Sequence, residues 1–139
     1  MIVLVAYMPM LMGTGGNSGS QSATLIIRGM ALSEVTLKDT GKVIWKEIRI
    51  SFIIGIALSS LNFVRICWLE GQGPYIAATV CVSMIIIVMA AKSIGSMLPM
   101  LAKRVGIDPA LMANPMIASI TDTISVITYF MMARIVLGI

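Results

Sequence analysis

The chain has 139 residues, of which 58% are hydrophobic and 12% are charged, and its formal net charge is +4. Soluble domains carry about 25% charged residues, so this composition excludes an ordinary soluble domain. Long apolar runs favour helices over a barrel, and we predict an all-α integral membrane protein in a lipid bilayer. The basic residues lie between or at the ends of the apolar runs, without a basic stripe that carries interleaved aromatics. We therefore expect no nucleic-acid partner.

Four hydrophobic segments follow one another along the chain, each long enough to cross a hydrocarbon core, which takes about 20 helical residues. They are predicted at about 2–27, 48–69, 75–101 and 110–137. The polar segment 29–47 between the first two is predicted to be an amphipathic connector at the membrane surface. Together they form one transmembrane domain over residues 1–139. Gly106 can close the third helix, and Asp108 with Pro109 can begin the fourth.

A glycine-rich polar stretch, Gly13 to Ser22, interrupts the first hydrophobic segment and follows Pro9. It predicts a helical bundle whose first helix is broken, because irregular backbone at membrane depth is tolerated only where it packs in protein or lines water. Gly15 and Gly19 also match a small-xxx-small pattern for close helix packing. The functional interpretation is a stretch of exposed carbonyls and amides beside a permeation path. The sequence leaves both interpretations open.

Lysine and arginine are distributed unevenly among the connections. The connector and the connection after the third segment are basic, whereas residues 70–74 hold no basic residue. Basic loops tend to face the cytoplasm, so we expect a multi-pass protein of the cell membrane with both basic loops cytoplasmic. Arg65 and Lys92 are expected near span ends, where long side chains extend to the headgroups.

Asp122 lies near the middle of the last apolar segment, with no basic residue within a helical turn. A charge at this depth costs at least about 2.5–3.5 kcal/mol on insertion scales, so such residues face a cavity or a partner. Spacings of three and four place Asp122 on one polar helical stripe. Its members are Asn114, Ala118, Ser119, Asp122, Ser125 and Tyr129, with Thr121 and Thr123 beside them.

The stripe predicts either a hydrogen bond to a neighbouring helix or an aqueous path. The chain has no histidine, and a lone carboxylate suits a hard cation that keeps its waters, as Mg²⁺ does. A single buried acid offers no acid–base pair, so we do not expect an enzyme.

Several motifs resemble the MgtE family of magnesium channels and transporters. The run from Pro9 to Gln21, with Gly-Gly-Asn-x-Gly-x-Gln, and then Arg28-Gly29 are similar to that family's second transmembrane helix. Gly95 to Pro99 and Asp108 to Ala110 resemble the end of the fourth helix and its turn, and Asn114 to Phe130 is similar to the fifth. The resemblance covers essentially the whole chain and corresponds to four of the family's five spans.

The resemblance implies a homodimer whose pore lies on the dimer axis and conducts Mg²⁺, the transported ion. It assigns Asp122 and Ala118 to the metal site: the carboxylate and its symmetry mate would bind the hydrated ion, which the Ala118 carbonyl would face. The pore-lining residues expected from the stripe and the resemblance are Gly16, Asn17, Gln21, Asn114, Ser119, Thr121 and Ser125. The alternative is a non-conducting membrane subunit that binds a partner through its glycine-rich helix.

Overall fold

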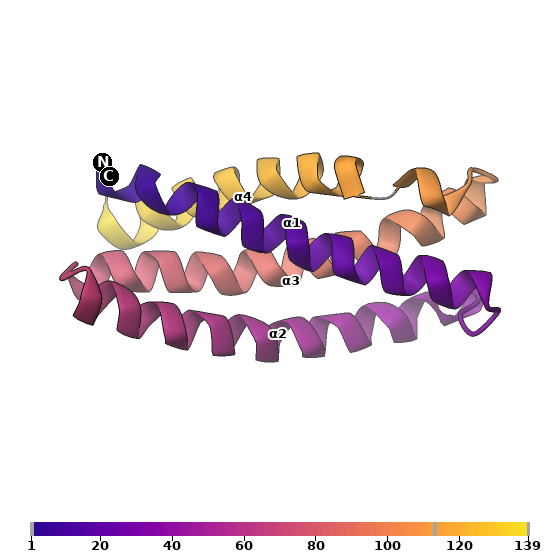
Figure 1. The fold of residues 1–139 in the computed structure, drawn as a ribbon, viewed down its shortest axis with the longest axis horizontal. Coiled ribbons are helices and arrows are strands. Elements are labelled where there is room, and N and C mark those ends of the chain that lie inside the picture. Colours follow the sequence, from indigo (N-terminus) through magenta and orange to yellow (C-terminus); the bar gives the residue numbers. More distant parts are fainter. Residues whose placement is uncertain (1, 113, 139) are drawn as a thin grey trace.

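A computed structural model describes residues 2–112 and 114–138, and every regular element within them is a helix (Figure 1). The long helices are α1 (Ile2–Ala31), α2 (Thr40–Val64), α3 (Pro74–Val105) and α4 (Asn114–Leu137). Two 3₁₀ segments, Leu37–Asp39 and Pro109–Met112, precede α2 and α4, and a π-helical turn, Arg65–Leu69, extends α2. The prediction of an all-α fold is confirmed.

Three of the described helical stretches are long and apolar enough to cross a membrane: Leu37–Leu69, Pro74–Val105 and Pro115–Leu137. This confirms the prediction of a membrane protein. α1, which carries glycine, serine, asparagine and glutamine along its middle, is not one of these three stretches.

The helices run alternately up and down, and α3 is the central one (Figure 1). It packs against α1, α2 and α4, while α1 also packs against α4. Half of the apolar stretch of α3 is buried, against 22% of those in α2 and α4. Because α2 and α4 each expose a broad apolar face, they suit contact with lipid or with another membrane protein.

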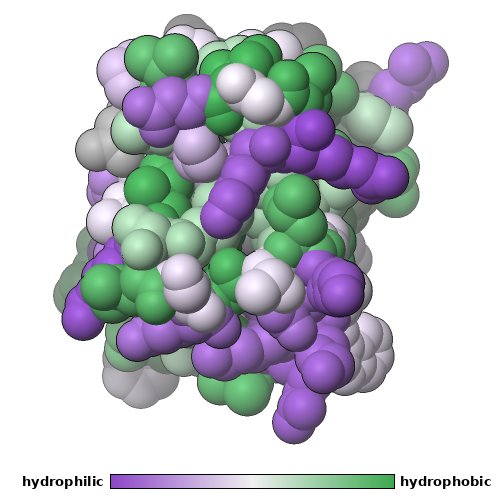
Figure 2. Space-filling model, turned by 90° about the vertical axis from the view of Figure 1, so that its right-hand side faces the viewer, coloured by the Kyte–Doolittle hydropathy of each residue, from purple (hydrophilic) through white to green (hydrophobic). Residues whose placement is uncertain are grey.

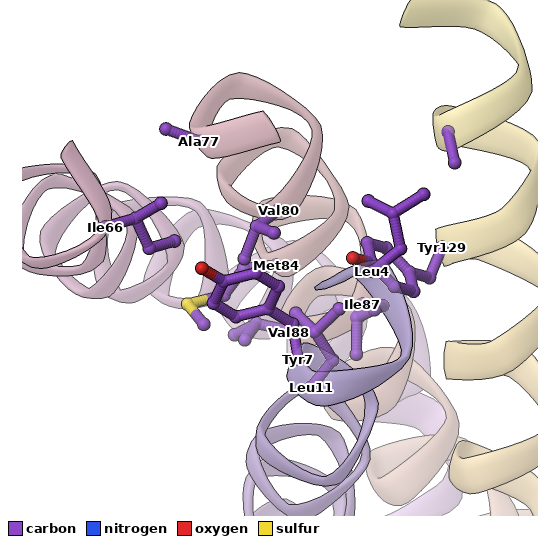
Figure 3. Close-up of a cluster of buried hydrophobic side chains, with 11 residues drawn as sticks. Leu4, Tyr7, Leu11, Ile66, Ala77, Val80, Met84, Ile87, Val88 and Tyr129 are labelled. Atoms are coloured by element: carbon purple, nitrogen blue, oxygen red, sulfur yellow. The ribbon is translucent and has the colours of Figure 1, made fainter. Parts of the chain in front are cut away.

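The core lies toward the end of the bundle where α1 begins and α4 ends. Leu4 and Tyr7 of α1 pack there with Met84 and Ile87 of α3 and with Tyr129 of α4 (Figure 3). These side chains are at most 6% exposed. This cluster holds α1, α3 and α4 together at one end of the bundle.

The prediction that the first helix is broken is wrong, because α1 runs without interruption through Pro9 and the glycine-rich stretch. A membrane-embedded segment has to satisfy its backbone groups internally, which favours a continuous helix over local glycine propensity. Glycine has a second use here: a Cβ at Gly95 of α3 would collide with the carbonyl oxygen of Gly19. The glycines therefore allow α1 and α3 to approach at backbone distance.

The predicted connector, residues 29–47, is mostly helical and belongs to two long helices. α1 continues to Ala31, and α2 already begins at Thr40. Thr36 donates hydrogen bonds to Asp39 from its backbone N–H (3.0 Å) and from its hydroxyl (2.6 Å), and Asp39 is the residue before α2. These bonds form a capping box for the short 3₁₀ segment, which leads directly into α2, so α2 starts eight residues before the span predicted at residue 48.

The turn between α3 and α4 agrees in part with the sequence. Gly106 has φ of +81° and ends α3, as predicted, because glycine adopts this left-handed conformation at little cost. Asp108 Oδ1 accepts a hydrogen bond from the Ala110 amide at 2.9 Å. This interaction begins the short 3₁₀ segment, and α4 itself begins only at Asn114.

Both basic connections lie at one end of the bundle, and residues 70–73 lie at the other with the start of α1 and the end of α4 (Figure 1). Hydrophilic side chains spread over the end with the basic connections, interspersed with apolar ones (Figure 2). Exposed basic residues at or near this end are Arg28, Lys38, Lys42, Lys103 and Arg104. The charge asymmetry predicted from the sequence is thus present between the two ends of the fold.

Candidate cation site

A groove of about 630 Å³ runs along the side of the bundle where α1 and α4 pack together. It is open along its length and is formed by these two helices alone. Its lining residues are Pro9, Met12, Gly13, Gly16, Asn17, Ser20, Ala118 and Asp122.

Asp122 is the acid of this groove. Its side chain is half-buried beside Gly16, where an added Cβ would lie 3.9 Å from Asp122 Oδ1. The ion pairs among the described residues are Arg65–Glu70 and Lys92–Glu47, so the Asp122 carboxylate faces the groove without a basic partner from this part of the chain. A carboxylate in this position favours a cation in the groove.

Ala118 lies one helical turn from Asp122 and also lines the groove. Its carbonyl oxygen accepts a hydrogen bond from Thr121 Oγ1 at 3.0 Å. A carbonyl oxygen has two lone pairs, and inside a helix one of them accepts the backbone N–H four residues on, so the Thr121 hydroxyl competes with any cation for the other.

Two predicted pore-lining hydroxyls of α4, Thr121 and Ser125, lie against α1 instead of in the groove. They are 2% and 1% exposed. An added Cβ at Gly15 would lie 2.9 Å from Ser125 Oγ, and one at Gly19 would lie 3.2 Å from Thr121 Cγ2. These two residues therefore build the helix contact behind the groove.

The other predicted residues are more scattered. Ser119 is exposed and donates a hydrogen bond to the Pro115 carbonyl within its own helix. Gln21 lies in an adjoining groove of about 530 Å³, together with Asn17, Ser20, Thr24 and Leu25. Asn114 begins α4, but its side chain falls outside the part of the chain that the structure describes.

The groove is also lined by residues absent from the expected pore-lining set: Pro9, Met12, Gly13 and Ser20. Gly13 and Ser20 belong to the glycine-rich stretch that was interpreted as lying beside a permeation path, but they were not singled out. Residues 9, 13, 16 and 20 follow a spacing of three and four, so they share a helical face with Asn17 nearby. Reading α1 as a continuous helix would have found them. The expectation of a broken helix hid that periodicity.

The bundle also contains a buried ion pair that the sequence did not reveal. Lys92 Nζ lies 3.2 Å from Glu47 Oε2, and the two side chains are 6% and 9% exposed. Ser22 of α1 donates a hydrogen bond to Glu47 Oε2 at 2.5 Å and accepts one from Lys92 Nζ at 3.0 Å. The prediction that Lys92 reaches the headgroups is wrong, because the side chain points to partners on α1 and α2.

Arg65 is also more than an anchor at a span end. Its guanidinium lies 3.5 Å from Glu70 Oε1, and Tyr7 donates a hydrogen bond to the other carboxylate oxygen of Glu70. Arg65 is half-buried and ties the end of α2 to α1 through these contacts. The arrangement lies at the end of the bundle opposite the basic connections.

No group of three or more Asp, Glu, His or Cys residues converges among the described residues. A single chain therefore offers one carboxylate and neutral oxygen ligands in its groove, rather than a protein cage for a dehydrated metal. This donor set suits Mg²⁺, which dehydrates reluctantly and is often held through one or two carboxylates and its own waters.

Comparison with known proteins decides the family. Residues 8–132 match the MgtE family of divalent cation transporters. The chain belongs to the MgtE family. It is 42% identical over 134 residues to the magnesium transporter MgtE of Thermus thermophilus, and 32% identical over 133 residues to that of Bacillus subtilis. These alignments cover 96% and 93% of the chain.

A third relative, the magnesium transporter MgtE of Enterococcus faecalis, is 27% identical over 131 residues. The chain spans 28% to 29% of the length of these relatives. The comparison therefore concerns less than a third of the length of each relative.

Proposed function

We propose that the chain conducts Mg²⁺ through a pathway formed where the grooves of two copies face each other. The observation that carries this proposal is Asp122, the acid of an otherwise neutral groove between two packed helices. The magnesium transporters that the chain resembles support Mg²⁺ as the ion.

Two copies are proposed because the groove is open on one side. A two-fold axis along the groove would bring the same patch of each copy together and would enclose the space between them. Two Asp122 carboxylates would then face each other, and a divalent cation between them would relieve their repulsion. Hydrated Mg²⁺ fits this arrangement because its waters can bridge to Asn17 and Ser20, which line the same groove.

The polar surface of α1 is long enough to serve as a path. The two adjoining grooves extend from Pro9 to Leu25, which corresponds to about 24 Å of helix at 1.5 Å per residue. A hydrocarbon core is about 30 Å thick. We propose that the basic connections lie in the cytoplasm and that all four long helices span the membrane, so the path leads toward the cytoplasmic end.

Flux down the electrochemical gradient needs no coupled reaction. Inward movement of a doubly charged ion across 100 mV gains about 4.6 kcal/mol, at about 2.3 kcal/mol per charge. We propose a passive channel or transporter for this reason.

The alternative is a non-conducting subunit that binds a partner through its glycine-rich helix. Part of the helix surface that such a partner would contact is already covered. Gly15 and Gly19, the small-xxx-small pair, contact α3 and α4 of the same chain. They are therefore occupied before any partner arrives.

The test is uptake of Mg²⁺ into proteoliposomes, measured with an enclosed fluorescent indicator. The Asp122→Asn variant should lose at least about 100-fold in flux, because each charged hydrogen bond to the hydrated ion is worth about 1.5–3 kcal/mol and two are lost per dimer. Glu34→Gln is the matched control, since Glu34 is an exposed acid outside both grooves. Flux that survives in Asp122→Asn would remove this carboxylate from the mechanism.

A further inference from the structure

The buried contact among Glu47, Lys92 and Ser22 is not part of the groove. It joins α2, α3 and α1 at the interior of the bundle, and all three residues are buried. Burying two charges is costly, and such a pair is weak evidence of stabilisation by itself. Both charged side chains also bond the Ser22 hydroxyl of α1, and this contact indicates a role in the orientation of that helix.

α1 presents opposite faces to the groove and to this contact. Gly16 and Ser20 line the groove, whereas Ser22 and Gly19 face the interior. In a helix, residues advance by about 100° each, so Ser22 lies about 160° around the helix from Ser20. A bond at Ser22 therefore acts on the back of the helix whose front lines the groove.

At the level of Gly19 and Gly95, side-chain shape restrains the rotation of α1 less than at the end of the bundle where Leu4, Tyr7 and Leu11 pack. Gly19 and Gly95 meet at backbone distance, and neither has a side chain that interlocks with the other helix. The Ser22 hydroxyl adds a directional contact at this level, because it donates to Glu47 at 2.5 Å and accepts from Lys92 at 3.0 Å. Both bonds involve a charged partner, and charged hydrogen bonds are stronger and more directional than neutral ones.

We infer that the Glu47–Lys92 pair is a positioning element that fixes the rotation of α1 through Ser22 and thereby aims Asn17 and Ser20 into the groove. Neither charged side chain touches the ion path. The role of the pair in flux rests on the proposed function, whereas its effect on the orientation of α1 does not.

Ser22→Ala is the informative variant. It removes one oxygen and leaves the Lys92–Glu47 pair intact at 3.2 Å, so no buried charge loses its ionic partner. The matched control is Ser83→Ala on α3. Ser83 is 0% exposed, as Ser22 is, but its hydroxyl donates at 2.7 Å only to the Thr79 carbonyl in its own helix.

Two measurements are made on the full chain in proteoliposomes. The first is the dependence of flux on Mg²⁺ concentration. The second is the rate at which a methanethiosulfonate reagent modifies Ser20→Cys, in a Cys67→Ala/Cys81→Ser background. Thr123→Cys, an exposed position on α4 outside the groove, reports any general change in accessibility.

We expect Ser22→Ala to lower the maximal flux about tenfold, because a small misplacement of the lining groups slows the passage of the ion. The half-saturating Mg²⁺ concentration should stay nearly unchanged, because the Asp122 charge remains in place. The modification rate of Ser20→Cys should change by about threefold or more, since it follows the exposure of the thiol. Thr123→Cys and the Ser83→Ala protein should behave as the parent does.

An unchanged modification rate of Ser20→Cys in the Ser22→Ala protein would overturn the inference, whatever the flux. A changed rate with unchanged flux would overturn the role of the pair in conduction. If the parent protein conducts no Mg²⁺, the proposed function fails, and the modification rate alone then decides whether the pair orients α1.

Discussion

Asp122 and Glu47 are both acids within long apolar helices, but their surroundings differ. Glu47 is 7% exposed and has Lys92 and Ser22 within 3.2 Å. Asp122 is half-buried in an open groove, and its neighbours there are a glycine, an alanine and neutral polar groups. Glu47 has its counter-charge inside the fold, whereas Asp122 has no basic partner among the residues that the structure describes. We therefore propose Asp122, and not Glu47, as the acid that binds a cation.

The largest effect on stability is expected from Lys92→Met. The Glu47 carboxylate would remain buried without its ionic partner, and breaking a buried pair in this way costs about 3–5 kcal/mol. The measurement is the free energy of unfolding in detergent micelles.

The double variant Glu47→Gln/Lys92→Met is the control for that experiment. It removes both charges together, and such replacements are often neutral. A double variant as unstable as Lys92→Met would show that the ion pair is not the cause of the loss.

Gly95→Ala is expected to destabilise the protein by about 3 kcal/mol, near the upper end for overpacked sites, because the new Cβ would meet the Gly19 backbone. Backbone cannot give way as a flexible side chain does. Thermal unfolding of the purified protein measures the effect. Native-like stability of Gly95→Ala would contradict the close approach of α1 and α3.

Bound Mg²⁺ should stabilise the protein through Asp122. At a free concentration 100 times the dissociation constant, a single site contributes about 2.7 kcal/mol. The rise in melting temperature with added Mg²⁺ should vanish in Asp122→Asn and persist in Glu34→Gln. An equal rise in both variants would place the bound ion elsewhere.

The smallest effect is expected at Gly13, on the open face of α1. An added Cβ there meets nothing within 4 Å, and alanine is favoured over glycine in a helix by about 1 kcal/mol. Gly13→Ala should therefore raise the stability by up to that amount, in contrast to Gly95→Ala. A loss of stability would indicate that this face is covered within one copy of the chain.

The sequence predicted the helical membrane fold because apolar runs of 20 or more residues have few other solutions. The role of Gly106 at the end of α3 was predictable from local chemistry, and the position of Asp122 at a groove was predictable from its depth in an apolar run. These features depend on residues near each other along the chain. The family resemblance added the residues of α1 that lie beside Asp122.

The features that sequence reasoning missed depend on contacts between distant residues. Lys92 and Glu47 are 45 positions apart, and only the packing of α2 against α3 brings them together. Packing also decides which residues of the polar stripe on α4 face the groove. Ala118 and Asp122 line the groove, while α1 covers Ser125 and Tyr129. Helical spacing indicates which residues share a face, but not which part of that face a neighbour will cover.

The most direct test of the two-copy path uses unmodified and Asp122→Asn chains that are co-expressed in equal amounts and purified together. If each conducting unit needs an Asp122 carboxylate from both copies, random pairing leaves about one quarter of the dimers active. We predict Mg²⁺ flux at about one quarter of that of the unmodified protein. Flux at one half would mean that the mixed dimers conduct, on average, half as well as the unmodified ones, and would contradict a pathway that needs an Asp122 carboxylate from both copies.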